Sequence, residues 1–161
     1  MKQRPGVRPT TGKVREALRS ILQDIYPGAV VADLFAGTGA LGADALDGGA
    51  ARVDFVERDR PQAIKLRSLG RVATGRLPQA LEVLEGPYDL ILADPPYGSP
   101  DGPATVALLG PLLKTGGLVV VEHHHKDAYP DELGDLRLEK RRRYGETAIS
   151  FYRPAEFTSQ P

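Results

Sequence analysis

Short runs of apolar residues alternate with segments in which apolar residues recur every three or four positions, from residue 11 to residue 122. The short runs are typical of buried strands, and the wider spacing is typical of helices. Because strands that alternate with helices build a parallel sheet, the pattern predicts an α/β fold with helices on both faces of the sheet. The predicted strands cover residues 29–35, 52–57, 71–73, 88–93 and 118–122, and the predicted helices cover residues 11–26, 41–47, 61–69, 78–84 and 104–113.

The hydrophobic pattern changes after residue 122. Residues 136–144 and 147–153 form two strand-like runs that meet at Gly145, with no helical pattern between them. Strands joined by so short a turn pair antiparallel. We therefore expect a mostly parallel sheet with an antiparallel edge.

The chain has 161 residues, the size of one domain, and we expect residues 1–161 to form a single domain. Neither end has a regular pattern, so we expect a basic arm over residues 1–10 and a flexible tail over residues 155–161. The chain lacks cysteine, which excludes disulfides and thiolate zinc sites. It has no signal-peptide pattern and no apolar run as long as a membrane span. We expect a cytoplasmic monomer with no membrane contact.

Charge is balanced overall but clustered locally. The formal net charge is zero, which argues against a general nucleic-acid binder. Residues 1–15 carry five cations and no acid, and a second basic cluster lies at residues 137–143, relieved by Glu139. Such clusters attract phosphate, although a solvated arm and an exposed strand face have the same composition.

A glycine loop connects the first predicted strand to the helix that follows. Gly37, Gly39 and Gly42 have the spacing that lets a nucleoside cofactor approach the backbone. Glu57 stands twenty residues after Gly37 at the end of the second strand, where a carboxylate accepts hydrogen bonds from ribose hydroxyls. The loop and the acid together predict a nucleoside-cofactor site.

The glycine loop alone leaves the identity of the cofactor open. Nicotinamide and flavin dinucleotides use the same loop geometry to hold a pyrophosphate. S-adenosylmethionine has no phosphate, but its amino-acid end carries an ammonium group that favours a nearby carboxylate. Asp33, which precedes the glycines, supplies negative charge there, and it also has the geometry to tie the loop through backbone hydrogen bonds.

The sequence Asp94-Pro95-Pro96-Tyr97 follows the apolar strand at residues 88–93. Ligands of an open parallel sheet lie beyond the carboxyl ends of its strands, which places Asp94 at the ligand crevice. The prolines stiffen the loop, so that the Asp94 carboxylate and the Pro95 carbonyl form a rigid pair of acceptors for the two N–H groups of a base amine. Tyr97 offers a ring face on which the base can stack. A turn that simply ends a strand is the alternative, but the tetrapeptide favours methyl transfer to an amine.

This tetrapeptide resembles the catalytic motif of methyltransferases that act on the amino groups of bases. Residues 8–18 (Arg-Pro-Thr-Thr-Gly-Lys-Val-Arg-Glu-Ala-Leu), with residues 33–39 and Val56-Glu57, resemble the bacterial 16S ribosomal RNA guanine-N2 methyltransferase family, the RsmD type. The resemblance covers residues 8–153 and implies the Rossmann-like fold of class I methyltransferases that depend on S-adenosylmethionine. It further implies rRNA methylation, with methyl transferred to N2 of a guanine in 16S ribosomal RNA, either free or within the small ribosomal subunit.

The resemblance and the motifs together define three sets of candidate residues and no metal site. His123-His124-His125 is interpreted as a polar loop, because adjacent residues of an extended segment point to opposite faces. The basic arm and the start of the first helix are expected to contact RNA phosphate or to cover the cofactor. The candidate catalytic residues are Asp94, Pro95, Pro96 and Tyr97, the cofactor-binding residues are Asp33, Phe35, Ala36, Gly37, Thr38, Gly39, Glu57 and Arg58, and the RNA-binding residues are Arg8, Thr11, Lys13 and Arg15.

The chain departs from the family pattern at two places. Arg19-Ser20 stands where the family usually has Phe-Asn, and Thr74-Gly75-Arg76 stands where the family often has an acid that contacts the adenine amine of the cofactor. Three other interpretations stay open. They are an amino methyltransferase acting on another base or on DNA, a non-catalytic RNA-binding relative, and a dinucleotide-dependent oxidoreductase, which leaves residues 94–97 unexplained.

Overall fold

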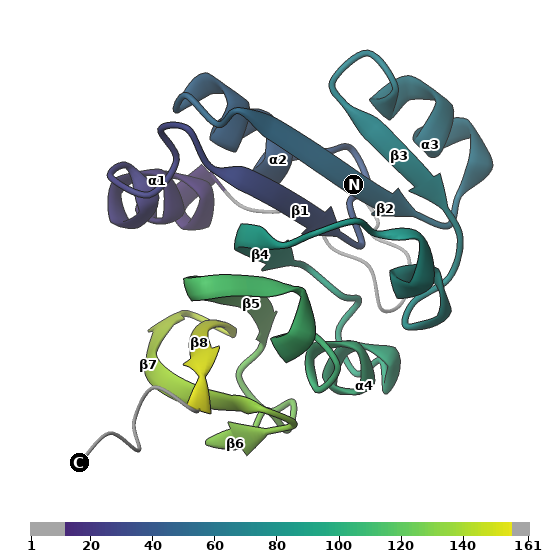
Figure 1. Cartoon of the computed structure of the whole chain (residues 1–161). Helices are drawn as coiled ribbons and strands as arrows, with labels where there is room; N and C mark the ends of the chain where they lie inside the picture. The colour runs from purple at the N-terminus through teal and green to yellow at the C-terminus, as the bar shows by residue number, and fades with distance from the viewer. Residues whose placement is uncertain (1–11, 156–161) are drawn as a thin grey trace.

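The computed structural model describes residues 12–155, and these residues contain an eight-stranded sheet with the order β3-β2-β1-β4-β5-β8-β7-β6 (Figure 1). Neighbouring strands from β3 to β5 pair parallel, and the pairs β5–β8, β8–β7 and β7–β6 are antiparallel. The prediction of a mostly parallel sheet with an antiparallel edge is therefore confirmed. The strands are β1 (Val30–Leu34), β2 (Arg52–Glu57), β3 (Arg71–Thr74), β4 (Tyr88–Ala93), β5 (Leu113–His124), β6 (Glu132–Leu133), β7 (Leu136–Tyr144) and β8 (Thr147–Pro154).

Helices cover both faces of the sheet. One apolar core contains Leu18, Leu41 and Leu66, which come from three helices and pack on one face. A second core contains Val106 and Leu77 and lies on the other face. The α-helices are α1 (Gly12–Leu22), α2 (Ala40–Asp47), α3 (Arg60–Leu66) and α4 (Asp101–Val106), and the 3-10 helices are η1 (Gln79–Val83) and η2 (Gly110–Leu112).

The central strands β1 and β4 are buried on both faces, which explains why they read as unbroken apolar runs. The connection after β1 leads to β2 on one side, whereas β4 lies on the other side of β1. Such a reversal of strand order opens a crevice at the carboxyl ends of the strands. We call this side of the sheet the carboxyl edge and the opposite side the amino edge.

Several predicted boundaries are wrong by a few residues, for local reasons. The first helix ends at Leu22 rather than residue 26, and the third spans 60–66 rather than 61–69. The helix expected over residues 104–113 begins at Asp101 and ends at Val106, and Gly110 and Pro111 belong to the separate 3-10 helix η2. The fifth strand starts at Leu113 rather than residue 118.

The predicted basic arm (residues 1–10) lies outside the described residues, as does all of the predicted tail except Ala155, whose N–H donates to the Asp135 carbonyl at 2.8 Å. Both stay predictions. Within residues 12–155, none of the helices is long and apolar enough to cross a membrane.

Candidate functional site

The glycine loop turns the chain sharply at the carboxyl end of β1. Phe35 has a φ of 58°, which is rare for a bulky residue, and Gly37 and Gly39 have φ values of 58° and 81°. A Cβ on Gly39 would collide with the Leu66 side chain, and one on Gly42 would lie 2.5 Å from Phe55 Cε1, so glycine lets α2 pack closely on β2 and α3. A Cβ on Gly37 would have no atom within 4 Å among the described residues. The backbone at Gly37 therefore faces open space, as a ligand-binding loop requires.

Glu57 is buried at the end of β2 and is fixed by two backbone groups. Its Oε1 accepts a hydrogen bond from the Gly37 N–H at 2.7 Å, and its Oε2 accepts one from the Asp59 N–H at 2.8 Å. Each carboxylate oxygen can accept a second hydrogen bond. Glu57 is thus oriented by the glycine loop and keeps acceptor capacity for the hydroxyls of a ribose.

Asp33 lies beneath the glycine loop and is almost fully buried, with 1% of its surface exposed. Its Oδ2 accepts a hydrogen bond from the Gly42 N–H at 2.9 Å. Burial, followed by the negative charges of Asp94 and Glu57, raises the pKa of Asp33 well above 3.8, although the Gly42 hydrogen bond opposes the rise. Tying the loop, one of the two roles expected for Asp33, is therefore seen directly.

Three carboxylates gather at the carboxyl edge, from Asp33 on β1, Glu57 on β2 and Asp94 after β4. The register brings their positions to one edge, because Leu34 of β1 pairs with Val56 of β2 and with Ala93 of β4. A ligand with positive charge would relieve their repulsion and would favour ionised Asp33. S-adenosylmethionine, with its ammonium and sulfonium groups, fits this requirement. The anionic pyrophosphate of a dinucleotide does not.

The remaining candidate cofactor residues border this group of carboxylates. The Ala36 N–H donates to the Val56 carbonyl at 3.0 Å, which holds the loop beside β2. Gly39 is buried, whereas Phe35, Ala36 and Gly37 are half-buried and Thr38 and Arg58 are exposed.

The Asp94–Tyr97 motif follows β4 and is anchored on both sides. The Asp94 N–H donates to the Leu34 carbonyl of β1 at 3.3 Å. The Tyr97 hydroxyl shares a hydrogen bond of 2.6 Å with Thr147 Oγ1 at the start of β8. A Cβ on Gly102 would lie 3.0 Å from Pro95 Cγ, so this glycine allows α4 to pack closely on the buried Pro95. The motif is therefore a rigid loop held between β1, α4 and β8.

The sequence did not reveal the residues that hold Tyr97. The Tyr97 ring meets the His124 ring edge to face, with centroids 4.9 Å apart. The Gly98 N–H donates to Asp127 Oδ2 at 3.1 Å. Thr147, His124 and Asp127 are far from Tyr97 in the sequence, and no local pattern connects them to it.

The interpretation of the three histidines as a polar loop is wrong for His123 and His124, which belong to β5, whereas His125 lies in the turn that follows. His123 is buried, donates from Nδ1 to the His124 carbonyl at 2.8 Å, and accepts at Nε2 from Ser150 Oγ at 2.7 Å. The His124 and His125 rings stack with centroids 4.7 Å apart. Among residues 12–155, no group of three or more histidine, aspartate or glutamate side chains is placed to hold a metal ion.

The candidate RNA-binding residues are only partly described. Arg8 and Thr11 lie outside the described residues, and Lys13 is exposed on α1. Arg15 forms a two-pronged ion pair with the buried Asp44 of α2, with Nη2–Oδ1 at 2.7 Å and Nε–Oδ2 at 3.1 Å. Hydrogen bonding to Asp44 raises the pKa of Arg15 above its ordinary value. An RNA contact by Arg15 stays a prediction, but the structure gives this side chain a second partner.

Both departures from the family pattern have structural partners. Arg19 adds a longer ion pair to Asp44, at 3.4 Å, and so strengthens the contact between α1 and α2. Arg76 pairs with Asp101 at the start of α4, at 3.3 Å.

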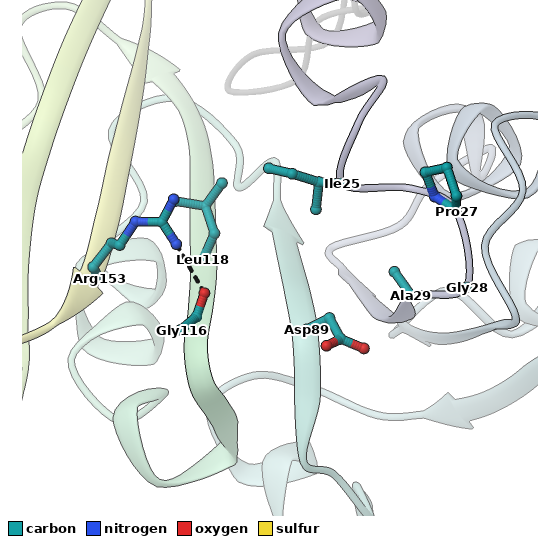
Figure 2. A pocket seen from close by; sticks show the side chains of 8 residues that line it. All are labelled: Ile25, Pro27, Gly28, Ala29, Asp89, Gly116, Leu118 and Arg153. Atoms are coloured by element: carbon teal, nitrogen blue, oxygen red, sulfur yellow. Dashed lines mark hydrogen bonds between the residues drawn. The ribbon is translucent and has the colours of Figure 1, made fainter.

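A pocket of about 260 Å³ lies at the other end of the sheet, the amino edge (Figure 2). Arg153 spans its rim and donates to the Gly116 carbonyl at 2.8 Å. Asp89 at the base of β4 accepts from the Val30 N–H at 2.8 Å and pairs with Lys114 at 3.1 Å. Arg153 and Asp89 each have partners within the fold, and the pocket lies at the opposite end of the strands from the glycine loop. We therefore place the functional site at the carboxyl edge.

The fold and this site define the class of the protein. Three features together are typical of a methyltransferase that depends on S-adenosylmethionine. They are the sheet order β3-β2-β1-β4-β5 with an antiparallel edge, the carboxylate that ends β2, and Asp-Pro-Pro-Tyr after β4. Residues 1–153 match the family model described as Conserved hypothetical protein 95, and the chain belongs to this family.

Named relatives agree with this class. The chain is 32% identical over 158 residues to Ribosomal RNA small subunit methyltransferase D of Escherichia coli (strain K12), covering 92% of this chain and 80% of that protein. It is 30% identical over 160 residues to the candidate rRNA methyltransferase YlbH of Bacillus subtilis (strain 168), covering 91% and 87%. The solved structure of the candidate methyltransferase yhhF of Escherichia coli superposes with a TM-score of 0.77 at 31% identity, covering 92% of this chain and 88% of that one. The predicted family, fold and enzyme class are therefore confirmed.

Proposed function

We propose that this methyltransferase transfers the methyl group of S-adenosylmethionine to N2 of a guanine in 16S ribosomal RNA. The observation that carries the proposal is the rigid Asp94–Tyr97 loop beside the carboxylates of Asp33 and Glu57. Supporting it, the chain resembles proteins named for methylation of small-subunit ribosomal RNA. The proposed partner is accordingly 16S ribosomal RNA or the small ribosomal subunit.

The cofactor would be held by the loop after β1 and by Glu57. Glu57 is oriented for the ribose hydroxyls by the Gly37 and Asp59 N–H groups. Asp33 would face the ammonium group, with Phe35, Ala36, Thr38 and Gly39 shaping the loop. When bound, S-adenosylmethionine supplies a methyl group on a positively charged sulfur. We expect Glu57→Ala to weaken binding of S-adenosylhomocysteine about 10- to 100-fold in a calorimetric titration; unchanged affinity would remove Glu57 from the ribose role.

The amine would be held by the loop after β4. The Asp94 carboxylate and the Pro95 carbonyl would accept the two N–H groups of the guanine amine and aim its nitrogen at the methyl group. These acceptors also favour the positive charge that develops on the nitrogen during transfer. The proton leaves afterwards to Asp94 or to water. Tyr97 would stack on the base, and its hydrogen bond to Thr147 holds the ring in place.

The RNA would approach from the side of α1. Arg8, Thr11 and Lys13 are proposed phosphate contacts, and Arg15 is proposed both to contact RNA and to hold α1 against α2 through Asp44. Contacts of this kind weaken as salt is raised.

The direct test is transfer of labelled methyl to small ribosomal subunits that lack the modification, followed by nucleoside analysis. The proposal predicts N2-methylguanosine as the labelled product, and naked 16S ribosomal RNA measured in parallel identifies the preferred form of the substrate. Label in another base, or in DNA supplied as competitor, would select a different amino methyltransferase. Binding of S-adenosylhomocysteine without any transfer would indicate a non-catalytic relative.

A further inference from the structure

A row of rings continues outward from Tyr97 along the carboxyl edge. The His124 ring follows Tyr97 at 4.9 Å, and the His125 ring stacks on His124 at 4.7 Å with an angle of 25° between the planes. The Nη2 group of Arg143 lies at the end of this row, 3.3 Å from His125 Nε2. The row therefore leads from the proposed base-binding ring to a cation.

The row belongs to the same rigid unit as the Asp94–Tyr97 loop. The His125 N–H donates to the Glu146 carbonyl at 2.9 Å, and Thr147, the residue after Glu146, holds the Tyr97 hydroxyl. The turn between β7 and β8 thus fixes Tyr97 and His125 relative to each other. A ligand that reached Tyr97 would meet His125 and Arg143 next.

We propose that this row is a second nucleotide subsite, in which His125 stacks on a base that flanks the target guanine and Arg143 contacts the neighbouring phosphate. The inference rests on the proposed function, because it assumes an RNA strand at Tyr97. Single-stranded nucleic acid is bound by such alternation of ring faces and cations.

The hydrogen bonds of Arg143 and His125 suit these roles. Arg143 donates from Nε to the Gly145 carbonyl at 2.7 Å and from Nη2 to His125, and a guanidinium has five N–H donors, so donors remain for a phosphate. Desolvation and the positive charge of Arg143 lower the pKa of His125 below 6.5. The His125 ring is therefore mostly neutral at pH 7. It would hold the flanking base of the RNA by stacking rather than by charge.

The charge around the row favours an anionic strand. Lys126, the residue after His125, is exposed and adds to the positive charge of Arg143. Two acids near the row already have partners. Glu146 is held by His124, whose Nε2 donates to Oε1 at 3.2 Å while its Nδ1 accepts from the Lys126 N–H at 3.0 Å, and Asp127 Oδ2 accepts from the Gly98 N–H at 3.1 Å.

The stacking role is tested by three substitutions of His125, to alanine, glutamine and phenylalanine. The readout is the affinity for unmodified small ribosomal subunits, measured directly with S-adenosylhomocysteine present so that it does not depend on transfer. His125→Ala and His125→Gln should weaken this affinity between about 5-fold and about 100-fold, and His125→Phe should keep it, because only phenylalanine restores a ring face. Affinity for S-adenosylhomocysteine should stay the same in all three variants, which shows that they fold.

The phosphate role is tested by Arg143→Gln, with Arg67→Gln as the matched control. Arg67 is exposed at the end of α3, toward the amino edge. Arg143→Gln should reduce the slope of log affinity against log salt by about 1, and Arg67→Gln should leave the slope unchanged.

Equal affinity of His125→Ala and the natural protein, or recovery by glutamine as complete as by phenylalanine, would overturn the stacking subsite. An unchanged salt slope for Arg143→Gln would remove the phosphate contact. Failure of the proposed function gives a different result, since the natural protein would then bind subunits without transferring methyl to them. Absence of binding by the natural protein would overturn both.

Discussion

Buried carboxylates at the carboxyl edge and in the amino half of the sheet have opposite surroundings. Asp33 faces the negative charges of Asp94 and Glu57, and burial together with these charges raises its pKa. Asp54 is also buried, with 4% of its surface exposed, but it faces Arg52, Arg71 and the Tyr88 hydroxyl. Burial raises the pKa of Asp54 too, yet the hydrogen bonds from Arg52 and Tyr88 and the charges of the two arginines outweigh burial and lower it.

The difference separates a structural carboxylate from a functional one. Asp54 has its positive partners within the fold, so its charge stabilises the native state. Among the described residues, the charged groups that shift the pKa of Asp33 are both negative, so a cationic ligand would add to the stabilisation that its charge receives from the Gly42 N–H. The carboxyl edge is therefore organised for binding at the expense of stability, as functional sites commonly are.

The largest expected effect is on transfer, from Asp94→Ala. This substitution removes the carboxylate acceptor for the amine but none of the hydrogen bonds that orient Glu57. We expect methyl transfer to fall by at least about 100- to 1,000-fold, the range for loss of one positioned group at a developing charge. Affinity for S-adenosylhomocysteine should stay within about threefold, because the carboxylates of Asp33 and Glu57 remain. Full turnover by Asp94→Ala, measured with labelled methyl and small subunits, would refute the mechanism.

Asp54→Asn should lower stability without touching the site. It breaks the two-pronged pair with Arg52 (3.0 and 3.1 Å) and the hydrogen bond from Tyr88 (2.7 Å). We expect a loss of about 1–3 kcal/mol in the free energy of unfolding, toward the lower end because Arg52 and Arg71 are partly exposed and screened. Urea denaturation at pH 7 measures the loss, and transfer per folded molecule should be unchanged.

The lowered pKa of Asp54 determines how the stability loss of Asp54→Asn changes with pH. Because the folded-state pKa of Asp54 lies below 3.8, its contribution to stability is present above pH 3.8 and disappears as the pH falls through the folded-state value. The natural protein and Asp54→Asn should therefore converge in stability in acid. A difference that is constant down to pH 2 would contradict the assignment of the effect to charge.

Asp33→Asn should raise the free energy of unfolding, the opposite of the effect expected for Asp54→Asn. Asparagine can still accept the Gly42 N–H but carries no charge, so we expect a gain of about 0.5–2 kcal/mol at pH 7, the usual range for one stabilising substitution. Because the folded-state pKa of Asp33 lies above 3.8, the folded chain binds more protons than the unfolded one between these values, and natural stability falls as the pH rises through them. The gain should therefore vanish below pH 3.8.

Cofactor binding provides the second measurement on Asp33→Asn. We expect its affinity for S-adenosylmethionine to fall about 10-fold or more, because the substitution removes a carboxylate that faces the cationic ligand. A calorimetric titration of both proteins with S-adenosylmethionine measures the difference. If Asp33→Asn is less stable than the natural protein and binds equally well, the contrast between Asp33 and Asp54 does not hold.

How much of the candidate site the sequence predicts depends on how far apart along the chain the contacting residues lie. The sequence predicts the places of Glu57 and Asp94 because Glu57 ends one apolar strand and Asp94 follows another, and parallel strands bring their carboxyl ends together. The Tyr97–Thr147 contact joins residues 50 positions apart, and only the register of β8 on β5 brings them together. Periodicity contains no information on such a register across an antiparallel edge.

The start of α4 has a local signal in the sequence that the hydrophobic pattern does not show. The start of α4 is marked by Ser99, whose Oγ accepts the Asp101 N–H at 3.2 Å, an arrangement typical of the first turn of a helix. The strand β6 has two residues, too few for an alternation pattern to reveal it. The extension of β5 through His124 depends on pairing with β8, which no property of three consecutive histidines predicts.

The smallest expected effect concerns Asp44, a second buried carboxylate that meets cations, and it decides between two roles of Arg15. Arg15→Gln removes the two-pronged pair, but Arg15 is 34% exposed and Arg19 still reaches Asp44 at 3.4 Å, so we expect a stability loss of about 0.5–1 kcal/mol. We expect Lys13→Gln, on the exposed side of α1, to leave stability unchanged and to reduce the salt slope of subunit binding by about 1. If Arg15→Gln reduces that slope as much as Lys13→Gln without lowering stability, Asp44 does not hold the guanidinium in solution. Arg15 would then belong with the RNA-binding residues, and Asp44 would join Asp33 as a buried acid whose partner is not supplied by the described part of the fold.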